Sequence, residues 1–135
     1  VISEALKDLD KTKVIVLKRD GNGQVSANCI GIPAVLPYTM AAEVNYQAFE
    51  LVSTDYHNAL YGYIEAEGWK NNFDAQYPTV SYNRERNGTV ITQRITLTEK
   101  IRHIIHHPEN RNNSYTEGDL KESIERMRSF IMAQP

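Results

Sequence analysis

The stretch from Thr96 to Asn110 (T-L-T-E-K-I-R-H-I-I-H-H-P-E-N) holds three of the four histidines in the chain. Imidazole changes its charge between pH 5 and 8, and it is also the commonest metal ligand. The stretch opens with a T-x-x-E capping signal and ends at Pro108, which stops a helix. Between them lies an apolar stripe at helical spacing, made of Leu97, Ile101, Ile104 and Ile105. We therefore expect a helix from Thr96 to about His107 that holds the histidines in fixed positions.

The histidines allow more than one interpretation. In the structural one, His103 and His106 face solvent, and His107 interacts favourably with the carboxyl end of the helix dipole. In the metal-binding one, His103 and His107 are ligands, because positions i and i+4 lie on one side of a helix. A third ligand would then be His57, Asp55 or Glu99. Because the sequence places none of these beside the histidines, we predict no metal site and no cofactor.

A third interpretation rests on a resemblance. Arg102 and His107 satisfy R-x4-H, and this motif is followed by a polar loop and a final amphipathic helix. From about Leu97 to Ile131 the chain resembles the C-terminal half of HEPN domains, a superfamily rich in ribonucleases. The resemblance implies metal-independent RNA cleavage across a dimer interface. Arg102 would hold a phosphate, and His107 would transfer a proton during attack by the ribose 2′-hydroxyl.

Composition limits the class of protein. The chain has 135 residues, 41% of them hydrophobic and 24% charged, as in a soluble globular protein, and we expect a single domain over 1–135. The net charge of −2 argues against a wide basic face for nucleic acid. Apolar runs are too short to span a bilayer, and no signal-peptide pattern is present. With Cys29 as the only cysteine, no intrachain disulfide can form. The expected location is cytoplasmic.

Two stretches alternate like β-hairpins. The first covers about 13–30 around the turn D-G-N-G, and the second covers about 79–95 around Asn87-Gly88, a step that favours tight turns. The second hairpin also contains three arginines that could contact phosphate or simply face water, namely Arg84, Arg86 and Arg94.

Helical spacing predicts a short helix over Ile2–Leu9 and one long helix over about 40–67, in addition to the two C-terminal helices. In the long helix, Asp55 falls within the apolar stripe and His57 points away from it. A carboxylate on a buried face needs a partner or a cavity, and tyrosines are useful in pocket walls. Asp55, Tyr56 and Tyr63 are therefore candidate ligand-binding residues.

Together these elements predict an α+β domain. An antiparallel sheet built from the two hairpins would have the long helix and the two C-terminal helices packed on it. The favoured function is a non-catalytic homodimer that binds a small molecule or a protein partner. Under the alternative, the chain is a HEPN-like ribonuclease that uses Arg102 and His107, and only then would nucleic acid be a partner.

Overall fold

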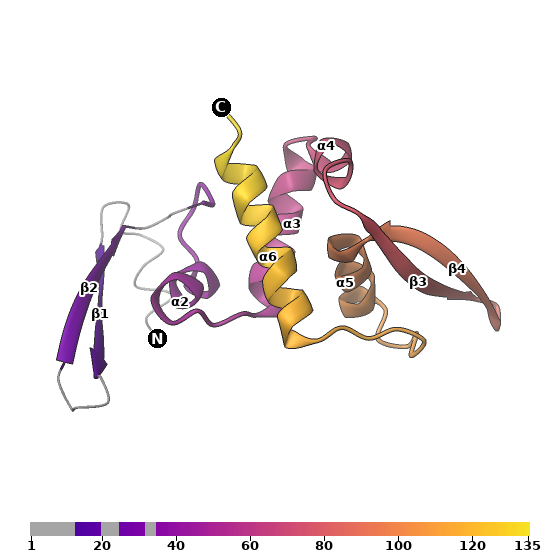
Figure 1. The fold of residues 1–135 in the computed structure, drawn as a ribbon, viewed down its shortest axis with the longest axis horizontal. Coiled ribbons are helices and arrows are strands. Elements are labelled where there is room, and N and C mark those ends of the chain that lie inside the picture. The colour runs from indigo at the N-terminus through magenta and orange to yellow at the C-terminus, as the bar shows by residue number, and fades with distance from the viewer. Residues whose placement is uncertain (1–12, 20–24, 32–34) are drawn as a thin grey trace. The chain divides into compact units, whose positions relative to one another are not determined.

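A computed structural model describes residues 13–19, 25–31 and 35–135 of the chain. These residues form five helices and two antiparallel hairpins, which confirms the α+β class (Figure 1). The chain divides into two compact units, residues 1–51 and 52–135. The helix expected at Ile2–Leu9 lies outside the described residues, and the single domain over 1–135 stays a prediction.

In the first unit, strand β1 (Lys13–Arg19) pairs antiparallel with β2 (Val25–Gly31), as the hairpin signal predicts. Helix α2 (Ala41–Phe49) belongs to the same unit. Near its start the carboxylate of Glu43 is buried and accepts a hydrogen bond from the backbone N–H of Leu36, 3.4 Å away.

The single long helix over 40–67 is wrong. Helix α2 ends at Phe49, where Glu50 adopts the left-handed conformation with φ 55°, and a separate helix α3 (Thr54–Ala66) follows. The hydroxyl of Ser53 accepts a hydrogen bond from the backbone N–H of Tyr56, 3.1 Å away, so it caps the new helix. A serine that can bond nearby backbone groups competes with helix continuation, and here that competition starts a second helix.

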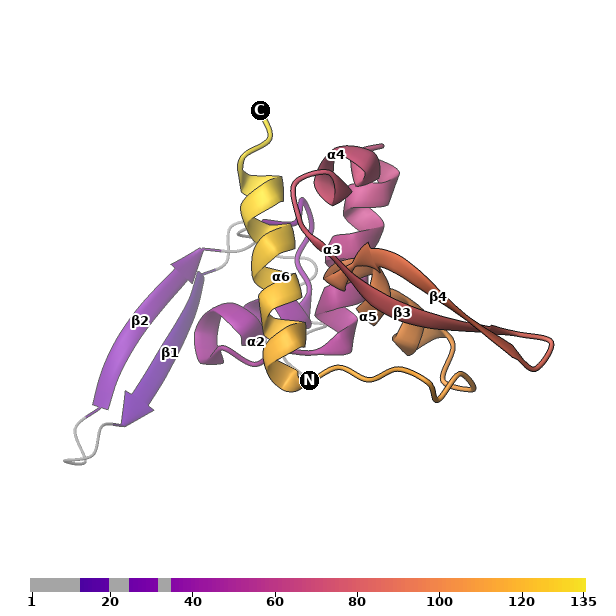
Figure 2. The ribbon, with the colours of Figure 1, turned by 45° about the vertical axis from the view of Figure 1, so that its right-hand side comes forward.

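Four helices build the second unit. They are α3, α4 (Lys70–Asp74), α5 (Leu97–His106) and α6 (Glu117–Met132). In Figures 1 and 2, α6 lies alongside α3, and α5 packs against both of them. The fully buried residues of these helices include Tyr56, Leu60, Ile64, Phe73, Ile101, Ile124 and Met127. Helix α5 begins at Thr96, the cap that the sequence predicts, and Thr116 caps α6.

A buried polar network joins three of these helices. Nε2 of His57 in α3 lies 2.8 Å from the hydroxyl of Ser123 in α6, which lies 2.7 Å from the hydroxyl of Thr98 in α5. All three side chains are buried. Because buried polar groups need partners, this chain of hydrogen bonds favours one arrangement of the three helices over others.

The second hairpin consists of β3 (Thr79–Arg86) and β4 (Thr89–Thr96). Its turn residues Asn87 and Gly88 have φ values of 53° and 75°, so the predicted Asn-Gly turn is confirmed and is of type I′. The sequence predicts that the two hairpins form one sheet, and this is wrong. The hairpins form two separate two-stranded sheets. Hydrogen bonds within each hairpin are local, and the alternation of side chains does not specify what pairs with its outer edges.

The loop between α5 and α6 binds the outer edge of β3. Asn113 accepts a hydrogen bond from the backbone N–H of Asn83 at 2.7 Å, and the side chains of Asn110 and Asn113 donate to the Asn83 carbonyl at 2.9 and 2.8 Å. These bonds fix the loop against the hairpin. No helix in the described part of the chain is long and apolar enough to cross a membrane.

Candidate functional site

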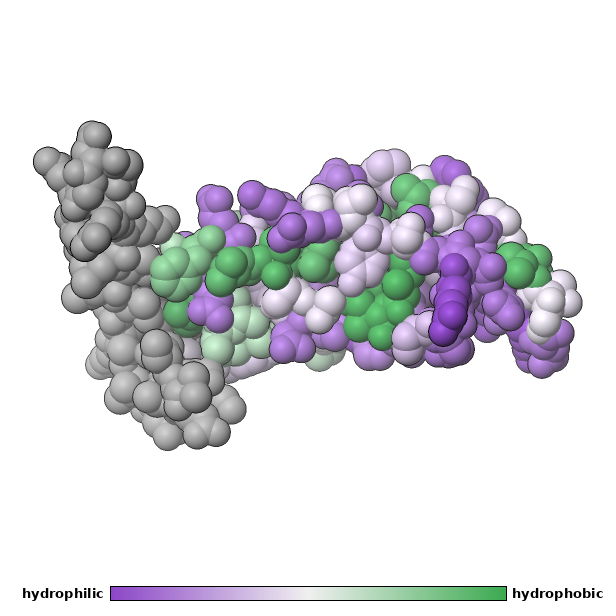
Figure 3. Space-filling model, turned by 90° about the horizontal axis from the view of Figure 1, so that it is seen from below, coloured by the Kyte–Doolittle hydropathy of each residue, from purple (hydrophilic) through white to green (hydrophobic). Residues whose placement is uncertain are grey.

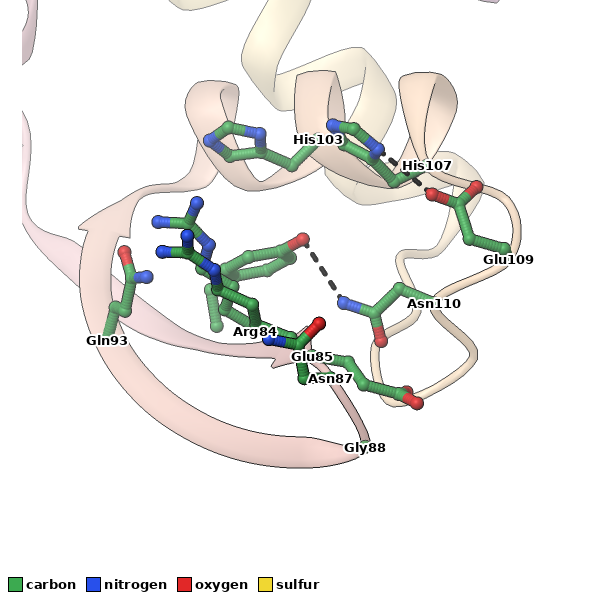
Figure 4. Close-up of a pocket in the computed structure, with 11 residues that line it drawn as sticks. Arg84, Glu85, Asn87, Gly88, Gln93, His103, His107, Glu109 and Asn110 are labelled. Carbon is green, nitrogen blue, oxygen red and sulfur yellow. Dashed lines mark hydrogen bonds and ion pairs between the residues drawn. The ribbon is translucent and has the colours of Figure 1, made fainter.

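A cavity of about 740 Å³ lies in the second unit, between the β3–β4 hairpin, the end of α5 and the loop that follows α5 (Figure 4). Most of the residues that line it are polar or charged. The hairpin contributes Tyr82, Arg84, Glu85, Arg86 and Gln93 together with the turn, and the helix and loop contribute His103, His107, Glu109 and Asn110. All of these residues come from one compact unit.

Strand alternation places the hairpin side chains. Tyr82, Arg84 and Arg86 are two residues apart, so they lie on one face of β3. The register pairs Tyr82 with Gln93, which puts Gln93 on that face as well. Tyr82 is buried against α5, whereas both arginines are exposed. In Figure 4 the side chain of Arg84 extends toward α5 on the side where His103 lies.

The helix side of the cavity is formed by two imidazoles. His103 stacks on the ring of Tyr82 with centroids 5.2 Å apart, and His107 lies one turn further with its ring 6.2 Å from that of His103. Asn110 completes this side by donating a hydrogen bond to the Tyr82 hydroxyl at 3.3 Å. The i, i+4 spacing recognised in the sequence thus places two histidines in one cavity, as Figure 4 shows.

The charges of the cavity are unequally paired. Glu109 lies 3.1 Å from Nδ1 of His107, and Glu85 accepts a hydrogen bond from Asn112 at 2.7 Å. Neither Arg84 nor Arg86 has a hydrogen-bond or ion-pair partner for its guanidinium among the described residues. Two cationic groups therefore remain available to a ligand while both carboxylates are engaged.

Arg102, the other residue of the R-x4-H motif, does not line the cavity. Its guanidinium donates to the side chain of Asn58 at 3.2 Å, lies 5.0 Å from the ring centre of Tyr61, and contacts Nε2 of His106. Burial, followed by the charge of Arg102, lowers the pKa of His106, which fits a neutral imidazole accepting from the guanidinium. Within one chain, Arg102 and His107 have different neighbours.

The three candidate ligand-binding residues lie elsewhere. Asp55 is exposed in the first turn of α3, so its placement on a buried stripe is wrong. The ring of Tyr56 is fully buried, and its hydroxyl accepts a hydrogen bond from Arg128 at 2.7 Å. Tyr63 is half-buried, with its ring edge-to-face with Trp69. None of the three lines the cavity.

His57 is also placed differently from the expectation. The sequence predicts a solvated side chain, whereas the structure buries it completely beside Ser123. The cause is the break at residues 50–53, because counting 100° per residue across a non-helical segment assigns α3 the wrong face. Burial, together with the charge of Arg102, lowers the pKa of His57 to about 4.

Metal binding receives no geometric support within the described residues. They contain no group of three or more histidine, cysteine, aspartate or glutamate side chains that could hold a metal ion. Glu99 lies 3.6 Å from Nε2 of His103, and it also lies 3.6 Å from the ammonium group of Lys70.

Reasoning from the sequence identified His103 and His107 and considered Arg84 and Arg86, but it did not connect them. Tyr82, Gln93 and Asn110 were missed. The alternation of β3 does contain a usable signal, since it places one buried aromatic ring and two arginines on the same face. What it lacks is any indication that this face packs against α5.

Comparison of the chain with known protein families, with characterised proteins and with solved structures finds no match.

Proposed function

We propose that the chain is a non-catalytic, homodimeric, cytoplasmic module that binds a phosphate-bearing small molecule in the cavity beside β3–β4. The observation that supports this most is the pair of guanidiniums, Arg84 and Arg86, which have no partner among the described residues and line a cavity together with two imidazoles. Guanidinium groups bind phosphate oxygens through paired, charge-assisted hydrogen bonds. Homodimers with two-fold symmetry are the commonest oligomers of soluble proteins.

The size and composition of the cavity fit a small ligand. Its volume of about 740 Å³ lies within the range of sites for small molecules. Asn110 and Gln93 add neutral hydrogen-bonding groups, and His103 and His107 add positive charge whenever they are protonated. An anion would thus meet donors from the hairpin and from α5 at once.

The first prediction concerns binding of pyrophosphate. Calorimetric titration at low salt is expected to show binding that weakens at least tenfold in Arg84→Gln and again in Arg86→Gln, since each change removes about 1.5–3 kcal/mol of charged hydrogen bonding. Citrate tests whether any polyvalent anion suffices. Arg111→Gln is the matched control, because Arg111 is exposed and outside the lining. Equal weakening in the control would attribute binding to net charge alone and reject the site.

A second candidate function is metal-independent RNA cleavage, as the HEPN resemblance implies. One observation favours it: His107 shares a cavity with two guanidiniums that have no partner among the described residues. A proton-transferring imidazole beside phosphate-binding groups suits cleavage of a phosphodiester by the neighbouring ribose 2′-hydroxyl. Arg102 would then act on a site completed by the second copy of a dimer, since in its own chain it contacts Asn58 and Tyr61.

This candidate predicts that RNA is degraded in the presence of EDTA and that His107→Ala lowers the rate at least a hundredfold, as loss of a general acid or base does. If the site spans two copies, mixing His107→Ala with Arg102→Ala restores part of the activity, because some mixed dimers contain one intact site. Gel-based RNA cleavage assays measure both results. Stable RNA in the presence of the wild-type protein would reject catalysis, and activity without restoration on mixing would reject the shared site.

A further inference from the structure

The two outer edges of the β3–β4 hairpin differ in whether their outward backbone groups are hydrogen-bonded. In a hairpin closed by a two-residue turn, residues alternate between those bonded to the partner strand and those whose backbone groups point outward. Because Arg86 and Thr89 flank the turn as a bonded pair, the outward-facing positions include Asn83 on β3 and Val90, Thr92 and Arg94 on β4. The observed bonds of Asn83 to the loop agree with this assignment.

Among the residues that the structure describes, only those of the β3 edge have their outward backbone groups bonded. Both backbone groups of Asn83 are bonded to asparagine side chains of the loop, whereas Thr92, which lies directly opposite Asn83, has no backbone partner on its outer side among the described residues. In Figures 1 and 2 the half of β4 near the turn runs along the outside of the hairpin, away from the helices of its unit. An unpaired strand edge is a template for another strand.

Apart from Arg94, the residues of β4 offer little protection to that edge. The strand, T-V-I-T-Q-R-I-T, contains no proline, lysine or acidic residue, which are the usual means of blocking edge pairing. Val90 and Ile91 are 49% and 56% exposed, and a small hydrophobic area is visible on the hairpin among hydrophilic side chains (Figure 3). Exposed apolar side chains beside free backbone groups are what an added strand would cover.

The charges of the hairpin indicate which kind of partner it would bind. Arg94 donates only to neutral oxygens of Thr79 and Ser81, and Arg84 and Arg86 have no partner among the described residues. The one carboxylate of the hairpin, Glu85, is bonded to Asn112. The hairpin therefore carries three positive charges that no carboxylate of the described residues neutralises.

From these observations we propose that the outer edge of β4 binds an extended acidic peptide segment of another protein, which adds to the hairpin as a third strand. Backbone groups of Val90, Thr92 and Arg94 would pair with the peptide, and the arginines would attract its acidic side chains. A second copy of the hairpin is disfavoured as the occupant, because it would bring three more guanidiniums to the same place. The backbone groups that would pair with the peptide lie at the β4 edge, outside the cavity, but Arg84 and Arg86 line the cavity and would be shared between the two sites.

The test uses the full chain and a fluorescein-labelled octapeptide that alternates glutamate and valine, followed by fluorescence anisotropy. Thr92→Pro removes an outward N–H without breaking a bond to β3, and it is expected to weaken binding at least tenfold. Thr92→Val is the matched control, because it also loses the hydroxyl bond to Asn83 but keeps the N–H. Its affinity is expected to stay within about twofold, as expected for an exposed position.

Changes in the peptide keep the test valid if Thr92→Pro fails to fold. Methylating the peptide backbone nitrogens is expected to weaken binding at least tenfold, and replacing glutamate with lysine is expected to abolish it. Unchanged affinity after methylation, or after the lysine exchange, would overturn the proposal. A second copy of the chain as the occupant would also overturn the proposal. In that case the wild-type protein does not bind the peptide, light scattering shows it to be a dimer, and Thr92→Pro makes it a monomer. Pyrophosphate titrations of the same variants report on the cavity separately.

Discussion

Lowering the pH from 7 to 4 is expected to reduce the free energy of unfolding by about 3 kcal/mol through His57 alone. In the folded chain burial lowers the pKa of this imidazole to about 4, compared with about 6.5 in an unfolded chain. Between these values the unfolded state binds a proton that the folded state does not, so stability falls as the pH drops. Well above pH 6.5 the imidazole is neutral in both states, and its contribution no longer changes.

The geometry explains why His57 resists protonation. Nε2 is occupied by the hydroxyl of Ser123 at 2.8 Å, and Nδ1 has no hydrogen-bond partner among the described residues. An imidazolium would have to donate from both nitrogens in a core without a carboxylate bonded to the ring, and it would meet the nearby charge of Arg102.

Chemical denaturation at a series of pH values measures this effect, and NMR of the imidazole signals gives the pKa directly. In His57→Gln the free energy of unfolding is expected to change less with pH between 6.5 and 4, because the difference of about one bound proton between the unfolded and folded states is removed. His107→Gln is the control, because His107 is exposed and its loss leaves the buried network intact. An NMR pKa of about 6.5 for His57 would contradict the prediction.

Replacing Tyr82 with alanine is expected to lower the free energy of unfolding by about 3 kcal/mol or more, the usual cost of deleting a buried aromatic ring. Two residues of the hairpin are buried, Tyr82 in β3 and Thr96 at the end of β4. The ring of Tyr82 stacks on that of His103 with centroids 5.2 Å apart. It therefore anchors the strand that presents Arg84 and Arg86. Pyrophosphate binding is expected to weaken in the same variant, because the hairpin loses its attachment to α5.

Two variants separate packing from hydrogen bonding. Tyr82→Phe keeps the ring but loses the bond from Asn110, so it is expected to cost only about 1 kcal/mol. Val90→Ala, on an exposed position of the same hairpin, is expected to change stability by less than about 0.5 kcal/mol. Equilibrium denaturation in urea measures all three. If Tyr82→Ala costs no more than Val90→Ala, the hairpin is not anchored through this ring.

Local signals in the sequence were sufficient for most elements of the fold. The Asn87-Gly88 turn, the cap at Thr96 and the proline after α5 each depend on residues a few positions apart, and the structure contains all of them. The break between α2 and α3 was missed, although its signal is also local. Ser53 caps a new helix there, but serine within an apolar periodic stretch is also compatible with an uninterrupted helix.

The candidate site depends on contacts that no local pattern specifies. His103 and His107 share one side of α5 because of helical spacing, and Arg84 and Arg86 share one face of β3 because of strand alternation. By itself, therefore, the sequence determined each half of the cavity. Only the tertiary structure decided that the halves face each other, that Arg102 turns toward Asn58, and that His57 enters the core. The physical reason is that periodicity sets the direction of a side chain within its own element, whereas the partner of that face is chosen by packing between residues far apart in the chain.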